Sequence, residues 1–201
     1  MLIGGNDLST DMFDSVADLC GGRNQPIVIL SQTLSKPETA GVWKEKFIGS
    51  GFTQVSIEED IEWSASEKQT LEKRLGTVRG IFVPDGSPGL FVKRFGMDWC
   101  QRVFPKFIDG GGIWIGMNGG ATLVGDPMFD GDEAVPGIGM FDGIVDFQYY
   151  QKHRELRLRN AYFSCRAQLG IGLNDGEWLV IRDGVIEKKV GVPHVILREA
   201  G

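Results

Sequence analysis

A sharp strand-to-helix turn with an asparagine at its apex carries the most chemical information in this sequence. The run Gly112-Ile-Trp-Ile-Gly-Met-Asn-Gly-Gly-Ala121 predicts a buried strand that turns directly into a helix. In many enzymes a G-x-S-x-G turn of this kind lifts a serine hydroxyl clear of the sheet, and the next backbone N–H helps to bind an oxyanion. The serine position is occupied here by Asn118. A carboxamide has no hydroxyl or thiol to activate, so the turn has the shape of a nucleophile site without a nucleophile.

Few other side chains could act as a nucleophile or a base. The two histidines, His153 and His194, fall on a predicted charged helix face and at a predicted strand edge. Ser87, in a predicted strand-end loop, is the best other hydroxyl, and we interpret it as a turn residue or helix cap. The three cysteines are odd in number and widely spaced, which predicts packed thiols with no disulfide framework and no metal site: Cys20, Cys100 and Cys165.

The charge and composition argue against several classes of partner. The formal net charge is −6 and no cluster of lysines and arginines forms a stripe, so we expect no nucleic-acid partner. No apolar run approaches the ~18 residues of a membrane span, and the start of the chain lacks a basic region followed by an apolar stretch. The glycine clusters at 4–5 and 110–112 lack the spacing of a nucleotide-binding loop. We therefore expect a cytoplasmic protein without membrane contact, cofactor or metal.

Short apolar runs alternate with amphipathic segments over the first part of the chain. Five runs have the aliphatic content and the Gly, Pro or polar borders of buried strands: residues 1–3, 26–30, 53–57, 80–83 and 113–116. Four segments between them have helical spacing: residues 9–20, 37–48, 64–75 and 89–99. Ser64-Ala-Ser-Glu67 matches a capping box, and Ser9 or Thr10 is a candidate cap. The alternation predicts an α/β fold with a doubly wound, mostly parallel sheet and helices on both faces.

The last third of the chain adds strands and a hairpin. A helix is predicted at residues 151–163. Strands are predicted around and after it, at residues 143–147, 169–173, 177–181, 185–190 and 192–197. The third and fourth of these flank Arg182-Asp-Gly184, an Asp-Gly turn that predicts a C-terminal β-hairpin. With 201 residues, 42% of them hydrophobic, and no linker or repeat, we expect a single domain over residues 1–201.

Several segments resemble one protein family in the same order along nearly the whole chain. They are Leu2-Ile-Gly-Gly-Asn6, Arg79-Gly-Ile-Phe-Val83, Gly116-Met-Asn-Gly-Gly-Ala121, Gly137-Ile-Gly-Met140, Val145-Asp146, residues 154–158, Leu169-Gly-Ile-Gly-Leu173 and Trp178-Leu-Val-Ile181. This ordered set resembles the cyanophycinase and peptidase E family of serine peptidases. The resemblance implies a class I glutamine amidotransferase-like, flavodoxin-like α/β fold. It is compatible with a homodimer as readily as with a monomer.

The resemblance also implies where catalytic residues would lie. The family's nucleophilic serine falls on Asn118, and its histidine, two residues after an aspartate, falls on Gln148. A glutamine has no nitrogen that titrates near neutral pH, so it cannot take up and return a proton. The acidic third member falls on Glu133, with Asp132 and Asp130 as alternatives. Without a histidine to orient, that carboxylate has no catalytic role, so the implied triad is degenerate.

Two further segments near the family's active site bear on the chemistry. The second glycine loop, Gly-Gly-Asp-Gln in the family, becomes Asp85-Gly86-Ser87-Pro88. That loop helps to line the oxyanion hole, so Asp85 sets a negative charge close to where a negative charge must develop. The family's arginine-rich segment lies beside the active site. Arg154 and Arg157 are therefore predicted to form a solvated helix face, to hold an acidic ligand or to support the site wall.

These substitutions predict a non-catalytic homologue that binds a peptide, an amino-acid-like ligand or a protein partner. Asparagine and glutamine keep donor and acceptor groups, so a polar crevice can persist without a nucleophile. We expect this crevice to be lined by Asp85, Gly86, Ser87, Asn118, Gly119, Gln148 and Arg154. One alternative is an active peptidase or amidohydrolase for Asp-containing peptides, with a relocated nucleophile such as Ser87 or Cys165. Another is a subunit of a larger assembly, whose crevice is filled by Met117, Phe147 or Tyr149.

Overall fold

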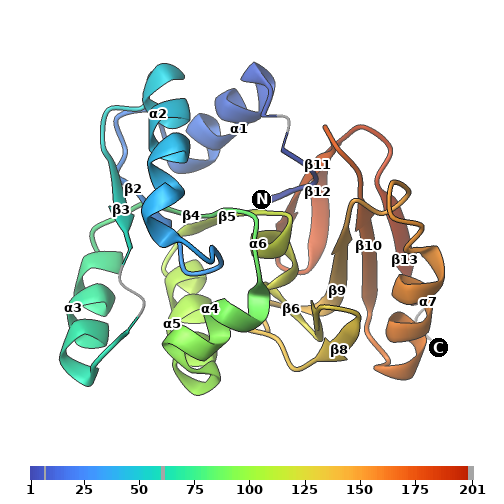
Figure 1. Ribbon diagram of the computed structural model, residues 1–201. Coiled ribbons are helices and arrows are strands. Elements are labelled where there is room, and N and C mark those ends of the chain that lie inside the picture. The colour runs from blue at the N-terminus through green and yellow to red at the C-terminus, as the bar shows by residue number, and fades with distance from the viewer. Residues whose placement is uncertain (7, 60–61, 199–201) are drawn as a thin grey trace.

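Five parallel strands form the centre of the computed structural model, which describes residues 1–6, 8–59 and 62–198 (Figure 1). In spatial order they are β3 (Val55–Glu58), β2 (Ile27–Leu30), β4 (Gly80–Val83), β5 (Ile113–Met117) and β1 (Leu2–Ile3). Beyond β1, an antiparallel pair continues this main sheet: β11 (Trp178–Arg182) and β12 (Val185–Val190). The five strands predicted for the first part of the chain are confirmed. Their carboxyl ends meet at one edge of the main sheet.

Helices cover both faces of the main sheet. In chain order they are α1 (Thr10–Cys20), a 3-10 helix (Pro37–Ala40), α2 (Gly41–Gly49), α3 (Ala65–Leu75), α4 (Pro88–Phe95) and α5 (Met97–Asp109). Successive strand residues point to opposite faces. Ile27 and Ile29 accordingly belong to the core beneath α1 and α2, whereas Val28 and Leu30 belong to the core shared with α3, α4 and α5. The two groups of helices lie above and below the sheet in Figure 1, so the doubly wound α/β class is confirmed.

Side-chain caps fix the starts of two helices. The Ser9 hydroxyl accepts a hydrogen bond from the Met12 N–H at 3.3 Å, and α1 begins at the next residue. At α3, the Ser64 hydroxyl accepts from the Glu67 N–H while the Glu67 carboxylate accepts from the Ser64 N–H, which is the predicted capping box. None of the helices in the described residues combines the length and apolar character that a membrane span requires.

The single helix predicted over residues 89–99 is wrong, because the structure has two helices there. Gly96 has φ 85° and ψ 133°, a backbone conformation open mainly to glycine, and it separates α4 from α5. Its N–H donates to the carbonyl of Val92 at 2.7 Å and closes α4. The rings of Phe95 and Trp99 stack across the break with centroids 5.0 Å apart. The apolar spacing therefore continues through Gly96, which is why periodicity gave no sign of the break.

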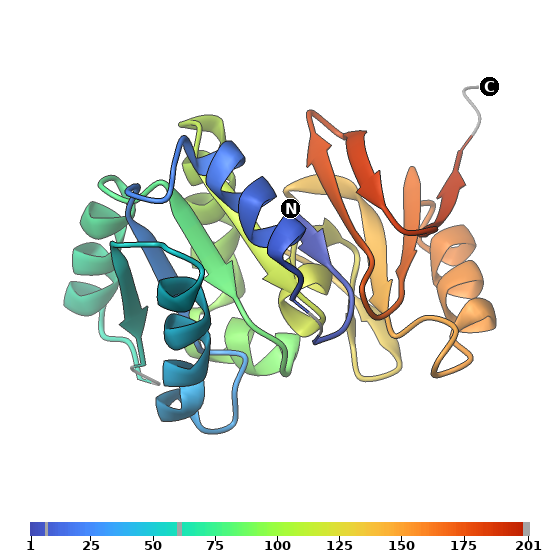
Figure 2. The same cartoon turned by 90° about the horizontal axis from the view of Figure 1, so that it is seen from above.

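A second sheet packs beside the main sheet (Figure 2). One of its faces contributes Val145 and Ile171 to the main core, and its other face packs against Leu158 of the last helix. Its strands β9 (Phe141–Phe147) and β10 (Leu169–Leu173) are parallel, and β13 (His194–Leu197) is antiparallel to β10. The sequence predicted these three strands and the helix but not their separation from the main sheet, nor the short elements before them. The short elements before these strands are α6 (Gly119–Thr122), β6 (Gly125–Asp126), β7 (Met128–Asp130) and β8 (Glu133–Val135), and the helix is α7 (Glu155–Ser164).

The predicted C-terminal hairpin is confirmed. Asp183 and Gly184 connect β11 to β12 with φ values of 50° and 74°. Two consecutive positive φ angles are those of a type I′ turn, whose twist matches the twist of the flanking strands. The hairpin extends the main sheet past β1 and ends at the amino edge of the parallel strands.

Candidate functional site

The predicted elbow lies between β5 and α6, with Asn118 at its apex. Asn118 has φ 47° and ψ −108°, which is a strained conformation for a residue with a side chain. Such strain is characteristic of the turn that presents a nucleophile in hydrolases of α/β type. Asn118 itself is fully buried, with 0% of its surface exposed. The elbow therefore has the backbone of a nucleophile site, whereas the side chain at its apex is closed off from solvent.

Close backbone contacts explain why the residues around the elbow are glycines, and no catalytic role is needed to account for them. A Cβ atom added at Gly116 would lie 2.3 Å from the carbonyl oxygen of Gly120. A Cβ atom at Gly119 would lie 2.0 Å from the carbonyl oxygen of Gly86. Side chains are excluded at both positions because the turn is tight and the loop after β4 packs directly on it. The Gly-x-Asn-Gly-Gly pattern thus preserves the fold of the elbow whether or not the site reacts.

The Asn118 side chain is held by the loop that follows β1. Its Oδ1 accepts a hydrogen bond from the Gly5 N–H at 2.6 Å, and its Nδ2 lies 3.5 Å from Oδ1 of Asn6. The Asn118 backbone N–H donates to the carbonyl of Ile3 at 2.9 Å. The ends of β1 and β5 are joined in this way, and the carboxamide forms a structural bond at the place where a nucleophile would lie.

The Asp85 carboxylate lies beside the elbow and is hydrogen-bonded to its backbone. Its Oδ1 accepts hydrogen bonds from the Gly86 N–H at 2.7 Å and from the Gly119 N–H at 3.2 Å. Gly119 follows the nucleophile position, and its N–H is the donor that binds the oxyanion in a catalytic elbow. The Thr33 hydroxyl donates to the carbonyls of Pro84 and Asp85 and holds this loop in place. Two backbone N–H groups at the elbow are therefore hydrogen-bonded to a carboxylate of the same chain.

Gln148 lies at the end of β9, in the second sheet. It has φ 50° and is half-buried, and its side chain forms no hydrogen bond within the described residues. The Thr122 hydroxyl of α6 donates to the carbonyl of Val145 in β9, so the elbow helix and β9 are in direct contact. Asn118 and Gln148 are not joined by a hydrogen bond in the described part of the chain. The second sheet thus borders the elbow without forming a nucleophile–base pair.

The three acidic candidates for the third member of the triad have other surroundings. Glu133 is exposed on β8. Asp132, with a side chain 95% exposed, forms an ion pair with Arg157 at 2.9 Å. Asp130 lies against Gly89 in the first turn of α4. Within residues 1–6, 8–59 and 62–198, none of the three hydrogen-bonds to Asn118 or Gln148.

A buried carboxylate that the sequence reasoning did not single out lies next to Gln148. Asp146 is fully buried, and its oxygens accept from Arg154 Nη1 at 3.0 Å and from Arg157 Nε and Nη2 at 2.9 and 2.5 Å. Arg154 also donates to the carbonyl of Phe147 at 2.6 Å. These bonds favour support of the site wall over capture of an acidic ligand by Arg154. The signal in the sequence was a lone aspartate inside an apolar strand, followed by a basic helix.

The alternative nucleophiles have ordinary surroundings. The Ser87 hydroxyl accepts from the Leu90 N–H at 3.1 Å and caps α4, as the sequence predicted. Cys165 is exposed, and its sulfur lies 3.9 Å from the Ser164 hydroxyl. The His194 ring stacks on the ring of Tyr149, with centroids 4.9 Å apart. Among the described residues, neither Ser87 nor Cys165 hydrogen-bonds to a side chain that could act as a base.

The thiols of Cys20 and Cys100 are sequestered in the two cores. Both are buried, and burial raises the pKa of the Cys20 thiol to about 11 and that of Cys100 to about 12. A thiol with a raised pKa carries little thiolate near neutral pH, and the thiolate is the reactive form. The interpretation of these two cysteines as packed side chains is consistent with this geometry.

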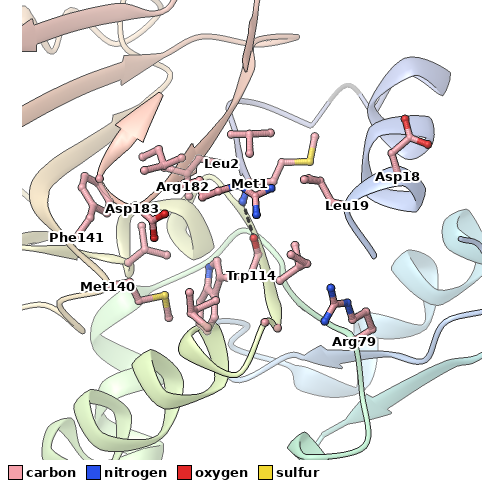
Figure 3. A pocket seen from close by; sticks show the side chains of 18 residues that line it. Met1, Leu2, Asp18, Leu19, Arg79, Trp114, Met140, Phe141, Arg182 and Asp183 are labelled. Carbon is pink, nitrogen blue, oxygen red and sulfur yellow. Dashed lines mark hydrogen bonds between the residues drawn. The ribbon is translucent and has the colours of Figure 1, made fainter. Parts of the chain in front are cut away.

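A cavity lies at the other end of the main sheet. Its volume is about 530 Å³, and its walls include the start of β1 and β5 at Met1, Leu2 and Trp114 (Figure 3). None of the seven residues expected to line a crevice at the elbow lines this cavity. The elbow and the cavity are therefore two separate features, at the carboxyl and the amino edges of the parallel strands.

Two solved structures share this fold over nearly their whole length. One is a peptidase from an acI-B1 Actinobacterium, with a TM-score of 0.65 and 12% sequence identity, covering 98% of this chain and 95% of that one. The other is a protein assigned to peptidase E from Listeria monocytogenes EGD-e, with a TM-score of 0.65 and 11% identity, covering 98% of this chain and 97% of that one. No protein-family model and no curated protein sequence matches the chain. The expectation of a peptidase E-like fold is confirmed.

Proposed function

We propose that this chain is a catalytically inactive homologue of peptidase E-type enzymes that acts by binding, as a receptor or scaffold for a peptide, an amino-acid-like ligand or a protein partner. One observation carries the proposal: Asp85 Oδ1 accepts hydrogen bonds from both the Gly86 and the Gly119 N–H groups. A hydrolase needs these donors for the negative oxygen of its tetrahedral intermediate. Here they are already bonded to a carboxylate.

The electrostatics of this arrangement oppose acyl transfer. An oxyanion forming at the elbow would meet the negative charge of Asp85 in place of two free donors, and like charges at hydrogen-bond distance repel. The nucleophile position offers only the amide of Asn118, which cannot be activated by a base. These two features oppose different requirements of the reaction: attack needs a nucleophile, and the oxyanion needs free N–H donors. Together they leave no route for an acyl-enzyme at this elbow.

Binding is supported by the groups that the site retains. Beside the elbow, Gly86 is exposed and Asp85 and Ser87 are partly exposed. The half-buried Gln148 carboxamide forms no hydrogen bond among the residues that the structure describes. A carboxamide offers both donors and acceptors, so this surface can recognise another polar group without reacting with it. Because Asn118 is fully buried, a partner would contact the loop of Asp85 and the end of β9 rather than the apex of the elbow.

Covalent labelling tests the proposal. Purified protein is incubated with a serine-directed fluorophosphonate and its intact mass is measured. We expect no adduct on the natural chain and none on Asp85→Gly, because freeing the anion site does not create a nucleophile. An adduct that maps to Ser87 and disappears in Ser87→Ala would support an active hydrolase with a relocated nucleophile. That result would overturn the proposal.

A further inference from the structure

The cavity at the amino edge of the main sheet has the size and lining of a small-molecule site. Its volume of about 530 Å³ lies within the ~300–1,000 Å³ typical of such sites. The lining combines apolar and charged side chains and comes from the main sheet, the second sheet, α1 and α5. Its partly exposed apolar residues include Leu19, Ile108, Ile113, Met140, Phe141 and Ile181. An apolar surface of this extent favours a ligand with a hydrophobic body.

One end of the cavity carries an uncompensated positive charge. Arg79, which precedes β4, forms no ion pair and no side-chain hydrogen bond within the described residues. In Figure 3 its guanidinium points toward the middle of the cavity, whereas the carboxylate of Asp18 at the same end points away. A Cβ atom at Gly111 would lie 3.1 Å from Arg79 Nη1, so the glycine leaves room for the guanidinium. Arginine binds carboxylates well because its planar fork presents two parallel N–H groups.

The other end of the cavity carries an uncompensated negative charge. Arg182 and Asp183 lie there, at the turn between β11 and β12. Arg182 Nε donates to Glu187 at 2.8 Å, so its charge has a partner. Asp183 has none in the part of the chain that the structure describes. The two ends therefore differ in sign: Arg79 is free at one, and Asp183 is free at the other.

We propose that this cavity binds a short apolar zwitterion, such as a peptide of apolar residues with free ends. The ligand carboxylate pairs with Arg79, its ammonium group pairs with Asp183, and its apolar side chains contact partly exposed apolar residues of the lining such as Ile113 and Met140. A simple anion with a hydrophobic body gains from Arg79 but meets the unpaired charge of Asp183, so the opposite signs at the two ends favour the zwitterion. This site is separate from the elbow and does not depend on the elbow being inactive.

Calorimetric titration with the peptide trileucine tests the site. We expect saturable binding to the natural chain. Arg79→Gln and Asp183→Asn should each weaken it about tenfold or more, because each removes one charge-assisted contact. Both variants are conservative: glutamine keeps much of the arginine stem, and asparagine tolerates the φ of 50° at position 183. Trileucine amide should bind the natural chain and Arg79→Gln equally, because it has no carboxylate for Arg79 to bind.

Two control variants separate the cavity from other surfaces. Asp18→Asn should leave the affinity unchanged, since that carboxylate points away from the cavity. Phe163→Ser alters a second hollow, between α7 and β13, and should also have no effect. Absence of saturable binding would overturn the proposal, as would binding that depends on Phe163 but not on Arg79 and Asp183. Mass spectrometry of the recovered trileucine is a separate readout, because cleavage would contradict catalytic inactivity and leave the cavity proposal intact.

Discussion

The carboxylate of Asp85 accepts a hydrogen bond from the backbone N–H of Gly119 at 3.2 Å. Gly119 is the residue directly after the apex of the elbow, and in a hydrolase its N–H would be reserved for the transition state. Asp85 also accepts from its neighbour Gly86 at 2.7 Å, so both donors are engaged before any ligand arrives. This relationship is the main reason for expecting that a chain with the fold of a peptidase does not hydrolyse peptides.

Restoring only the missing side chains should fail to restore reactivity. Asn118→Ser combined with Gln148→His supplies a hydroxyl and an imidazole, but Asp85 still fills the anion site. Adding Asp85→Gly should raise the rate of fluorophosphonate labelling by about 100-fold or more, since loss of a single oxyanion donor costs about 10²–10³ in rate. The rates are measured by gel fluorescence at equal protein concentration. Equal labelling of the double and triple variants would show that Asp85 is not the block.

Removing the Asn118 carboxamide should destabilise the fold. The Asn118→Ala variant leaves the buried Gly5 N–H without its acceptor, which costs roughly 1–3 kcal/mol of unfolding free energy. Gln148→Ala is the control, because its half-buried side chain makes no hydrogen bond in the described residues, and it should change stability by less than about 0.5 kcal/mol. Urea denaturation followed by circular dichroism gives both values. Similar midpoints for the two variants would contradict a structural role for Asn118.

The Arg157–Asp146 pair should matter far more than an exposed pair of the same type. Asp146 is 0% exposed and the Arg157 side chain 15%, so Arg157→Met leaves a buried carboxylate with one cationic partner, Arg154, and the backbone N–H of Phe147. We expect a loss of about 3 kcal/mol or more. In the matched control Arg182→Met, the ion pair with Glu187 is 58% and 44% exposed, and the loss should be under about 1 kcal/mol. Comparable losses would show that the buried pair is not a main support of this region.

The three thiols should differ in reactivity. At about pH 8 we expect one thiol per chain, Cys165, to react rapidly with a disulfide reagent, and all three to react in urea. Burial raises the pKa of Cys20 from 9.0 to about 11 and that of Cys100 to about 12. The stability gained by keeping them neutral is complete below pH 9 and is lost as the pH rises toward these values. Rapid reaction of Cys20 or Cys100 at about pH 8 would contradict their burial.

Local patterns predicted most of the main sheet, because each strand there is a short apolar run bounded by Gly, Pro or polar residues. The capping pairs at Ser9 and Ser64 predicted helix starts for the same reason, since the cap and its partner are three residues apart. Gly96 was missed because the apolar spacing of Phe95 and Trp99 runs through it. The short strands β6, β7 and β8 have only two or three residues each, too few to show an alternation.

The site was harder to predict from the sequence than the fold, because its decisive contacts join residues far apart in the chain. The position of Asp85 in a loop beside the elbow followed from the resemblance, but the hydrogen bond to Gly119 depends on how two loops pack. The burial of Asp146 between two arginines is likewise a tertiary property. No sequence pattern marked the cavity between Arg79 and Asp183, since its walls come from the second sheet as well as the first.

The central claim is the absence of catalysis at the elbow, and a peptide hydrolysis assay tests it most directly. Aspartyl dipeptides and a β-linked Asp-Arg substrate are incubated with the purified natural chain and with Asn118→Ala, and release of free amino acids is measured against a protein-free blank. We expect both proteins to match the blank. Turnover by the natural chain that disappears in Asn118→Ala, with that variant shown to be folded, would contradict it.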